Sequence, residues 1–111
     1  MKSLLEKNKE FILFLNGLHS SERRKILTHL GGEYINTIAE IFHNFLRQNL
    51  TKDPSIIKKV KSYRDHIKKV SFKTVPLHQK KRILQSKQGG AILSVLLPLA
   101  ASLITSLIST R

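Results

Sequence analysis

The longest stretch without a charged side chain lies near the C-terminal end, where residues 91 to 108 are eighteen uncharged and mostly aliphatic residues. A helix that is apolar on every side must be covered on every side, either by protein or by lipid. A chain of 111 residues has little surface with which to cover such a helix. We therefore expect this apolar segment to lie in a membrane or in a larger assembly, with burial inside the monomer as the alternative.

The length and the proline of this segment bear on the membrane alternative. Its eighteen residues lie at the short end of the range of roughly 17 to 25 that spans a bilayer as a helix. Pro98 removes a backbone donor near the middle, one turn after Ser94. We expect an oblique or interfacial position that perturbs the bilayer, rather than a stable anchor. The residues expected to contact membrane or assembly are Leu93, Leu96, Leu97, Pro98, Leu99, Leu103 and Ile104.

Charge divides the rest of the chain into two unequal parts. Residues 1 to 50 carry seven Lys or Arg against five acids, a balance of +2. Residues 51 to 90 carry twelve against Asp53 and Asp65, a balance of +10. A concentrated positive field raises the local concentration of polyanions within a Debye length, about 8 Å at physiological salt. The basic part therefore predicts a nucleic acid or an anionic lipid surface as the partner.

Apolar residues recur at helical spacing along the chain, and no strand-like alternation extends far, so we expect an all-α fold. A small helical N-terminal unit, residues 1 to 50, should hold helices at about 4 to 16 and 33 to 49. A short helix between them would be capped by Ser20 or Ser21 and would carry Arg23 on the face opposite its apolar residues. The expected core of this unit includes Phe11, Leu15, Ile38, Phe42 and Phe45.

A basic helical segment, residues 51 to 88, should follow. Asp53 before Pro54 is a start signal, because Asp caps free amides and proline at the first helical position loses no hydrogen bond. A fifth, short helix should end before Gly89 and Gly90. The first of these basic helices should present a narrow apolar seam of Ile56, Val60, Tyr63, Ile67 and Val70.

Lys and Arg around such helices can neutralise phosphates without reading bases. Arg is scarce beside Lys in this segment, which disfavours bidentate base recognition and therefore sequence-specific binding. A solvated face that only keeps the protein soluble is the alternative, but such a face usually mixes both signs of charge. The expected nucleic-acid-binding residues are Lys58, Lys59, Lys61, Arg64, Lys68, Lys69, Lys73, Lys80, Lys81, Arg82 and Lys87.

Other residue types give no sign of catalysis or metal binding. The five histidines are separated by ten or more residues, so no pair has the one-turn spacing of two metal ligands on a helix. The absence of cysteine excludes thiol nucleophiles and Cys-ligated zinc. The acids fit helix first turns and exposed faces. We expect no catalytic residue, no metal and no cofactor.

Residues 88 to 109, reading QGGAILSVLLPLAASLITSLIS, resemble the C-terminal part of the adenovirus core protein X precursor, in which a basic region precedes a double glycine and an apolar, proline-interrupted stretch. The whole chain also resembles in architecture the small basic proteins of Polinton or Maverick elements and of adintoviruses. The positions that match the adenovirus core protein X precursor are Gly89, Gly90, Leu96, Leu97, Pro98, Leu99, Ala100 and Ala101.

This resemblance implies a virion protein associated with packaged double-stranded DNA, found in the virion and the host nucleus, with capsid proteins as further partners. It also implies cleavage by the viral cysteine protease after the double glycine Gly89–Gly90. A cut after Gly90 would present Lys87 four positions earlier, where that protease family prefers an aliphatic residue.

The sequence thus favours a nonenzymatic DNA-virus protein that binds DNA non-specifically through its basic segment and contacts capsid or membrane through a tail, residues 89 to 111. The alternative is a tail-anchored or membrane-lytic protein whose Lys80, Lys81, Arg82 and Lys87 bind anionic lipid beside the apolar segment. If the tail is separable, its deletion should abolish vesicle binding while DNA binding persists. The oligomeric state is left open.

Overall fold

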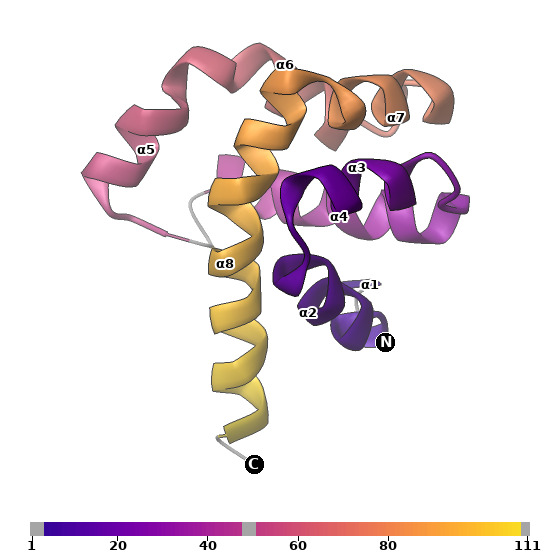
Figure 1. Cartoon of the computed structure of the whole chain (residues 1–111). Helices are drawn as coiled ribbons and strands as arrows, with labels where there is room; N and C mark the ends of the chain where they lie inside the picture. The colour runs from indigo at the N-terminus through magenta and orange to yellow at the C-terminus, as the bar shows by residue number, and fades with distance from the viewer. Residues whose placement is uncertain (1–3, 48–50, 110–111) are drawn as a thin grey trace.

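A computed structural model describes residues 4–47 and 51–109, and within these ranges the chain forms eight α-helices and one 3-10 helix, without a strand. The all-α fold expected from the spacing of apolar residues is confirmed. Figure 1 shows the other helices gathered around the upper part of the long C-terminal helix.

The N-terminal half contains α1 (Leu4–Lys7), α2 (Lys9–Gly17), α3 (Ser20–Leu27) and α4 (Gly32–Leu46). The single helix expected at 4 to 16 is divided at Asn8, whose side-chain amide donates to Leu4 O at 3.2 Å and to Thr37 Oγ1 at 3.0 Å. The cap of α3 is His19 rather than a serine, and its backbone amide donates to Glu22 Oε1 at 3.3 Å. The expected end of α4 at residue 49 lies outside the described residues.

The basic segment forms α5 (Pro54–Val60), the 3-10 helix η1 (Lys61–Tyr63), α6 (Arg64–Ser71) and α7 (Leu77–Gln85). Asp53 caps α5 as expected, since its Oδ1 accepts from the Ser55 backbone amide at 3.0 Å and from the Ser55 hydroxyl at 2.8 Å. These hydrogen bonds from Ser55 favour the carboxylate and hold the pKa of Asp53 below its ordinary value. The apolar seam continues through η1, with Val60, Ile67 and Val70 fully buried.

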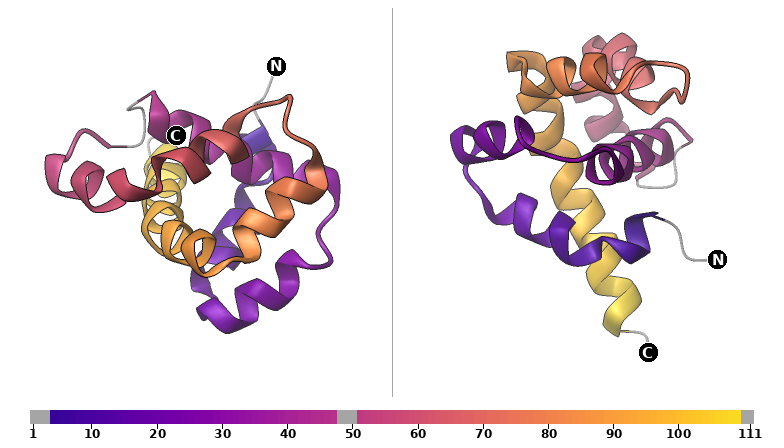
Figure 2. Two further views of the ribbon diagram at one scale, coloured as in Figure 1. Left: turned by 90° about the horizontal axis from the view of Figure 1, so that it is seen from above. Right: turned by 90° about the vertical axis from the view of Figure 1, so that its right-hand side faces the viewer.

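Helix α8 (Lys87–Ser109) crosses three stacked layers of helices (Figure 2). It packs against α2, α3, α4, α5, α6 and α7. The expectation that the apolar segment lies outside a monomer core is wrong for one face of α8, which packs against other helices, whereas positions such as Ser94 and Pro98 are exposed. Between residues 87 and 105, the hydrophobic side chains of α8 that are buried are Ile92, Leu93, Leu96, Leu97, Ala100, Ala101 and Ile104.

A single hydrophobic cluster includes residues from the N-terminal unit, the basic segment and the apolar tail. Of the five core residues expected in the N-terminal unit, Leu15, Ile38, Phe42 and Phe45 are buried. Phe11 is half-buried, and its ring lies 4.3 Å from that of Tyr34 between centroids. The three segments therefore differ in composition, but they share one core.

The corner between α7 and α8 depends on Gly89, which is buried in the first turn of α8. A Cβ atom at this position would lie 2.8 Å from both Cα and O of Leu84 and closer still to the carbonyl oxygen of Ile83. At Gly90 a Cβ would meet nothing within 4 Å. Gly89 thus lets two helices approach closely, whereas Gly90 is under no such constraint.

The guanidinium of Arg23 joins the N-terminal helices to α8, contrary to the exposed face expected for it. Arg23 is buried, and its Nε and Nη2 donate to Leu15 O at 3.2 Å and Leu18 O at 3.0 Å. Its Nη1 donates to Ser94 Oγ on α8 at 3.5 Å. A cation at the C-terminal end of α2 also complements the helix dipole. Burial lowers the pKa of Arg23.

Candidate nucleic-acid interface

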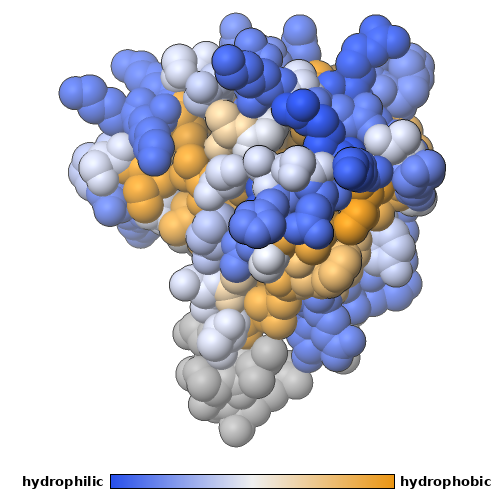
Figure 3. All heavy atoms as spheres, viewed as in Figure 1, coloured by the Kyte–Doolittle hydropathy of each residue, from blue (hydrophilic) through white to orange (hydrophobic). Residues whose placement is uncertain are grey.

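Helices α5, α6 and α7 form one outer layer, at the top of the molecule in Figure 1. Their apolar seam turns inward: α6 packs against α4, and α5, α6 and α7 each contact α8. Because the seam is narrow, most of the remaining helical surface is left for charged side chains. Figure 3 shows hydrophilic residues covering the molecule over this layer, with hydrophobic residues below it beside α8.

Ten of the eleven expected nucleic-acid-binding side chains reach solvent, and eight of those ten are exposed. Lys68 and Lys81 are half-buried, because they flank the apolar seam. Lys61 and Arg64 also line a small pocket of about 250 Å³ with Phe45, Leu46 and Ile57. The exposed side chains are Lys58, Lys59, Lys61, Arg64, Lys69, Lys73, Arg82 and Lys87.

These cations are not neutralised by neighbouring acids. The salt bridge found within the described ranges joins Lys7 Nζ to Glu33 Oε1 at 2.7 Å, away from the basic layer. Asp53 is engaged with Ser55, and Asp65 lies in the first turn of α6, where an acid complements the helix dipole. The positive charges of the layer are therefore available to an external anion.

Lys80 departs from the expected site. Only 4% of its surface is exposed, so it cannot lie against the backbone of a DNA duplex in this conformation. Burial disfavours its charged form and lowers the pKa of its ammonium group. Its neighbours Lys81 and Arg82 remain solvent-accessible, because they occupy other faces of α7. Lys80 is therefore not part of the nucleic-acid-binding surface.

The structure adds residues that a reading of the segment alone did not include. Arg24 and Lys25 are exposed on α3, which packs against α7, and Gln85 Nε2 donates to Thr28 Oγ1 at 2.9 Å across this contact. Arg24 and Lys25 are far from the basic segment in the sequence, so the sequence did not indicate that α3 lies beside α7. Phe72 is also notable, because 51% of its surface is exposed beside Lys73.

The residues expected to contact membrane or assembly are mostly turned inward. Leu93, Leu96, Leu97 and Ile104 are buried, Leu99 and Leu103 are half-buried, and Pro98 is exposed. The peptide bond after Gly90 lies within α8, so a protease that binds extended chains would reach it only after the first turns had unwound. Cleavage at Gly89–Gly90 stays a prediction.

Comparison with protein-family models, with curated proteins and with solved structures finds no match.

Proposed function

We propose that the protein is a nonenzymatic DNA-binding protein that neutralises the phosphates of double-stranded DNA through the outer layer of α5, α6 and α7. The observation that carries this proposal is the set of eight exposed Lys and Arg side chains on this layer, on the connection 72–76 and at the start of α8, with no acid paired to them in the described part of the chain. Counterion release from phosphates gives such a surface its affinity.

The chemistry of the layer favours binding without base recognition. Six of the eight exposed cations are lysines, which act as flexible point charges rather than as planar forks matched to a base edge. Contacts of this kind fix a protein on the duplex but carry no sequence information. We therefore propose non-specific binding. The virion setting, nuclear location and capsid partners are proposed from the resemblance to core proteins of DNA viruses.

Contact with an anionic membrane is the second candidate. Residues Lys87–Thr105 are long and apolar enough to cross a bilayer, with a mean hydropathy of 1.6, and 44% of this window is buried in the fold. The lower end of α8 projects beyond the other helices (Figure 1). Insertion of the whole helix would draw Leu93, Leu96 and Leu97 out of the core. This cost favours the DNA proposal.

The DNA proposal is tested by measuring affinity for a duplex at several salt concentrations. If six to eight phosphates are neutralised, log K should fall against log salt with a slope of about −5 to −7. The triple variant Lys58→Gln, Lys59→Gln, Lys69→Gln should flatten this slope by about 2 to 3. The charge-matched control Lys7→Gln, Lys9→Gln, Arg47→Gln, on α1, α2 and the end of α4, should flatten it by about 1 or less.

Two results would overturn non-specific DNA binding: a slope near zero, or strong preference for one duplex over scrambled competitors. A parallel sedimentation experiment with anionic vesicles distinguishes the second candidate. Stable pelleting with vesicles, together with weak DNA binding, would favour the membrane function.

A further inference from the structure

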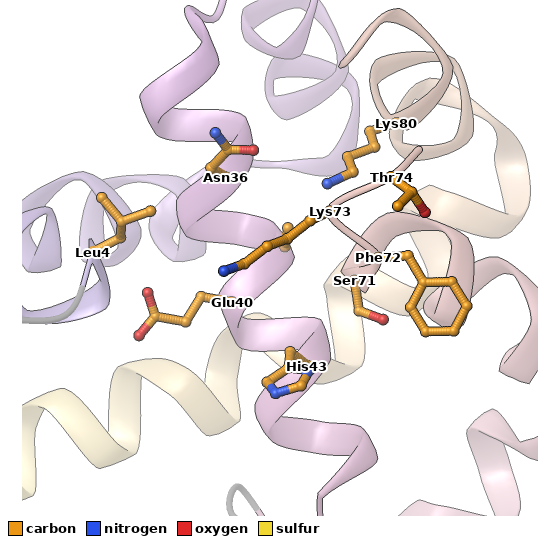
Figure 4. A pocket seen from close by; sticks show the side chains of 10 residues that line it. Leu4, Asn36, Glu40, His43, Ser71, Phe72, Lys73, Thr74 and Lys80 are labelled. Carbon is orange, nitrogen blue, oxygen red and sulfur yellow. The ribbon is translucent and has the colours of Figure 1, made fainter. Parts of the chain in front are cut away.

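An open pocket of about 750 Å³ lies between α4, the start of α1, the connection 72–76 and α7. Its volume is within the range of about 300 to 1,000 Å³ typical of small-molecule sites. Figure 4 shows the polar side chains that line it, which come from segments far apart in the sequence. The charged and amide groups among them belong to Asn36, Glu40, His43, Lys73 and Lys80.

Lys80 is the unusual member of this set. Its side chain is 96% buried, yet it lines the pocket, and Figure 4 shows its ammonium nitrogen directed inward toward the side of Asn36. Within residues 4–47 and 51–109 this ammonium makes no hydrogen bond or ion pair. Most of the Lys80 side chain is buried and its ammonium has lost part of its hydration, so an anion placed in the pocket would compensate this charge.

Other groups extend the positive end of the pocket. Lys73 enters from the connection between α6 and α7, and Thr74 beside it brings a hydroxyl. The Lys73 side chain points in the direction of Glu40, but the two groups form no ion pair within the described residues. Both ammonium groups are thus available to a ligand that carries several negatively charged oxygens.

Glu40 gives the pocket a second, different end. One carboxylate oxygen, Oε2, accepts from the backbone amide of Leu5 at 3.2 Å. A carboxylate repels an anionic group but accepts hydrogen bonds from hydroxyls. The pocket therefore holds Lys80 at one end and the acceptor Glu40 at the other, with the Lys73 ammonium directed toward Glu40.

We propose that this pocket binds a small organic phosphate, with the phosphate group between Lys73 and Lys80 and a hydroxyl-bearing remainder toward Glu40. A phosphate monoester matches the site because it carries a charge of about −1.5 to −2 and three acceptor oxygens. A single carboxylate would leave one of the two ammonium groups without a full counter-charge. The pocket shares Lys73 with the nucleic-acid interface, but Lys80 belongs to the pocket alone, so a Lys80 variant tests the two proposals separately.

The test uses the full chain and measures its melting temperature against inorganic phosphate and ribose 5-phosphate, with sodium chloride at matched ionic strength as the reference. We expect saturable stabilisation by both, with ribose 5-phosphate binding more tightly through its hydroxyls. Lys80→Met should weaken phosphate binding at least tenfold. The control Arg82→Gln, an exposed cation on the same helix, should change it less than twofold. Absence of saturable binding, or binding retained by Lys80→Met, would overturn the site.

A second measurement does not depend on a variant. Nuclear magnetic resonance can follow the titration of the Lys80 side chain, and bound phosphate should raise the pKa of this group because an anion favours the ammonium form. An unchanged pKa while phosphate saturates the protein would place the anion elsewhere. Duplex affinity should change less than twofold in Lys80→Met. A loss of tenfold or more would show that a DNA phosphate uses the pocket and would contradict a separate small-molecule site.

Discussion

Helix α8 is almost entirely apolar, and the layer of α5, α6 and α7 is strongly basic. The apolar side chains of α8 mostly face other helices, whereas the charged side chains of the layer mostly face solvent. The basic layer and the flanking residues Lys73 and Lys87 place eight cations in solvent, as the composition of the basic segment indicated. The apolar helix lies against six other helices, although its composition indicated a partner outside the monomer. Excess charge must remain near solvent or an anion, whereas an apolar run is satisfied by lipid or by protein. Charge therefore constrains location more tightly than hydrophobicity does.

Deletion of residues 89 to 111 tests this comparison with the largest expected effect. The truncated chain would lose the buried faces of α8, including Leu96 and Ala100, and would leave an apolar groove where α2 and α7 now contact it. We expect loss of cooperative thermal melting and a large fall in helical content, measured by circular dichroism. The milder change Leu96→Ala should lower the free energy of unfolding by about 2 to 5 kcal/mol.

A truncated chain that melts cooperatively with undiminished helicity would instead show that α8 is a separable tail. Binding of the full chain to anionic vesicles should then be measured, because an apolar segment outside the core needs a partner.

The two adjacent glycines provide a smaller effect with an internal control. Gly89→Ala places a methyl group against the backbone of Ile83 and Leu84, which cannot move away as a side-chain end could. Overpacking of this kind costs about 1 to 3 kcal/mol. Gly90→Ala meets open space and should be neutral or stabilising by up to about 1 kcal/mol, because alanine favours helix. Urea unfolding of both variants measures the difference, and equal stabilities would contradict the close helix approach.

The pH dependence of Lys80 gives the smallest expected effect. Its pKa in the folded chain is lowered from 10.5 by burial, so the unfolded chain binds more protons between the two pKa values. Stability should therefore rise with pH from the folded pKa of Lys80 toward 10.5. Urea unfolding at a series of pH values should show this rise in the parent and in Arg82→Gln. Lys80→Met should lack it, and an identical rise in that variant would assign the effect to another group.

Local signals in the sequence placed most helices but not their environments. Asp53 and Pro54 marked the start of α5, because capping and proline geometry act over a few residues. The break at η1 was not predicted, because the apolar seam continues through it without interruption. The cap at His19 was not predicted either, because Ser20 and Ser21 are both good cap residues. The His19 cap is local, because its backbone amide donates to Glu22 Oε1, and η1 contacts its chain neighbours α5 and α6.

The misplaced residues are those whose role depends on distant neighbours. Arg23 and Lys80 stand in charged runs that look solvated, but α8 and α4 enclose them. Gly89 was expected to follow the end of a helix, whereas it lies inside α8 and its lack of a side chain admits the backbone of α7. Most of the lysines in the basic segment were correctly predicted to be exposed, because burying so many cations would cost too much free energy.

Hydrogen–deuterium exchange of the whole chain, alone and with duplex DNA, most directly tests the central claim that the basic layer is the binding surface and α8 is core. The amides of residues 92 to 104 should exchange slowly in the free protein and change little with DNA. Those of α5, α6 and α7 should slow when DNA is added. Fast exchange throughout α8 in the free protein, with protection appearing only on anionic vesicles, would contradict this assignment.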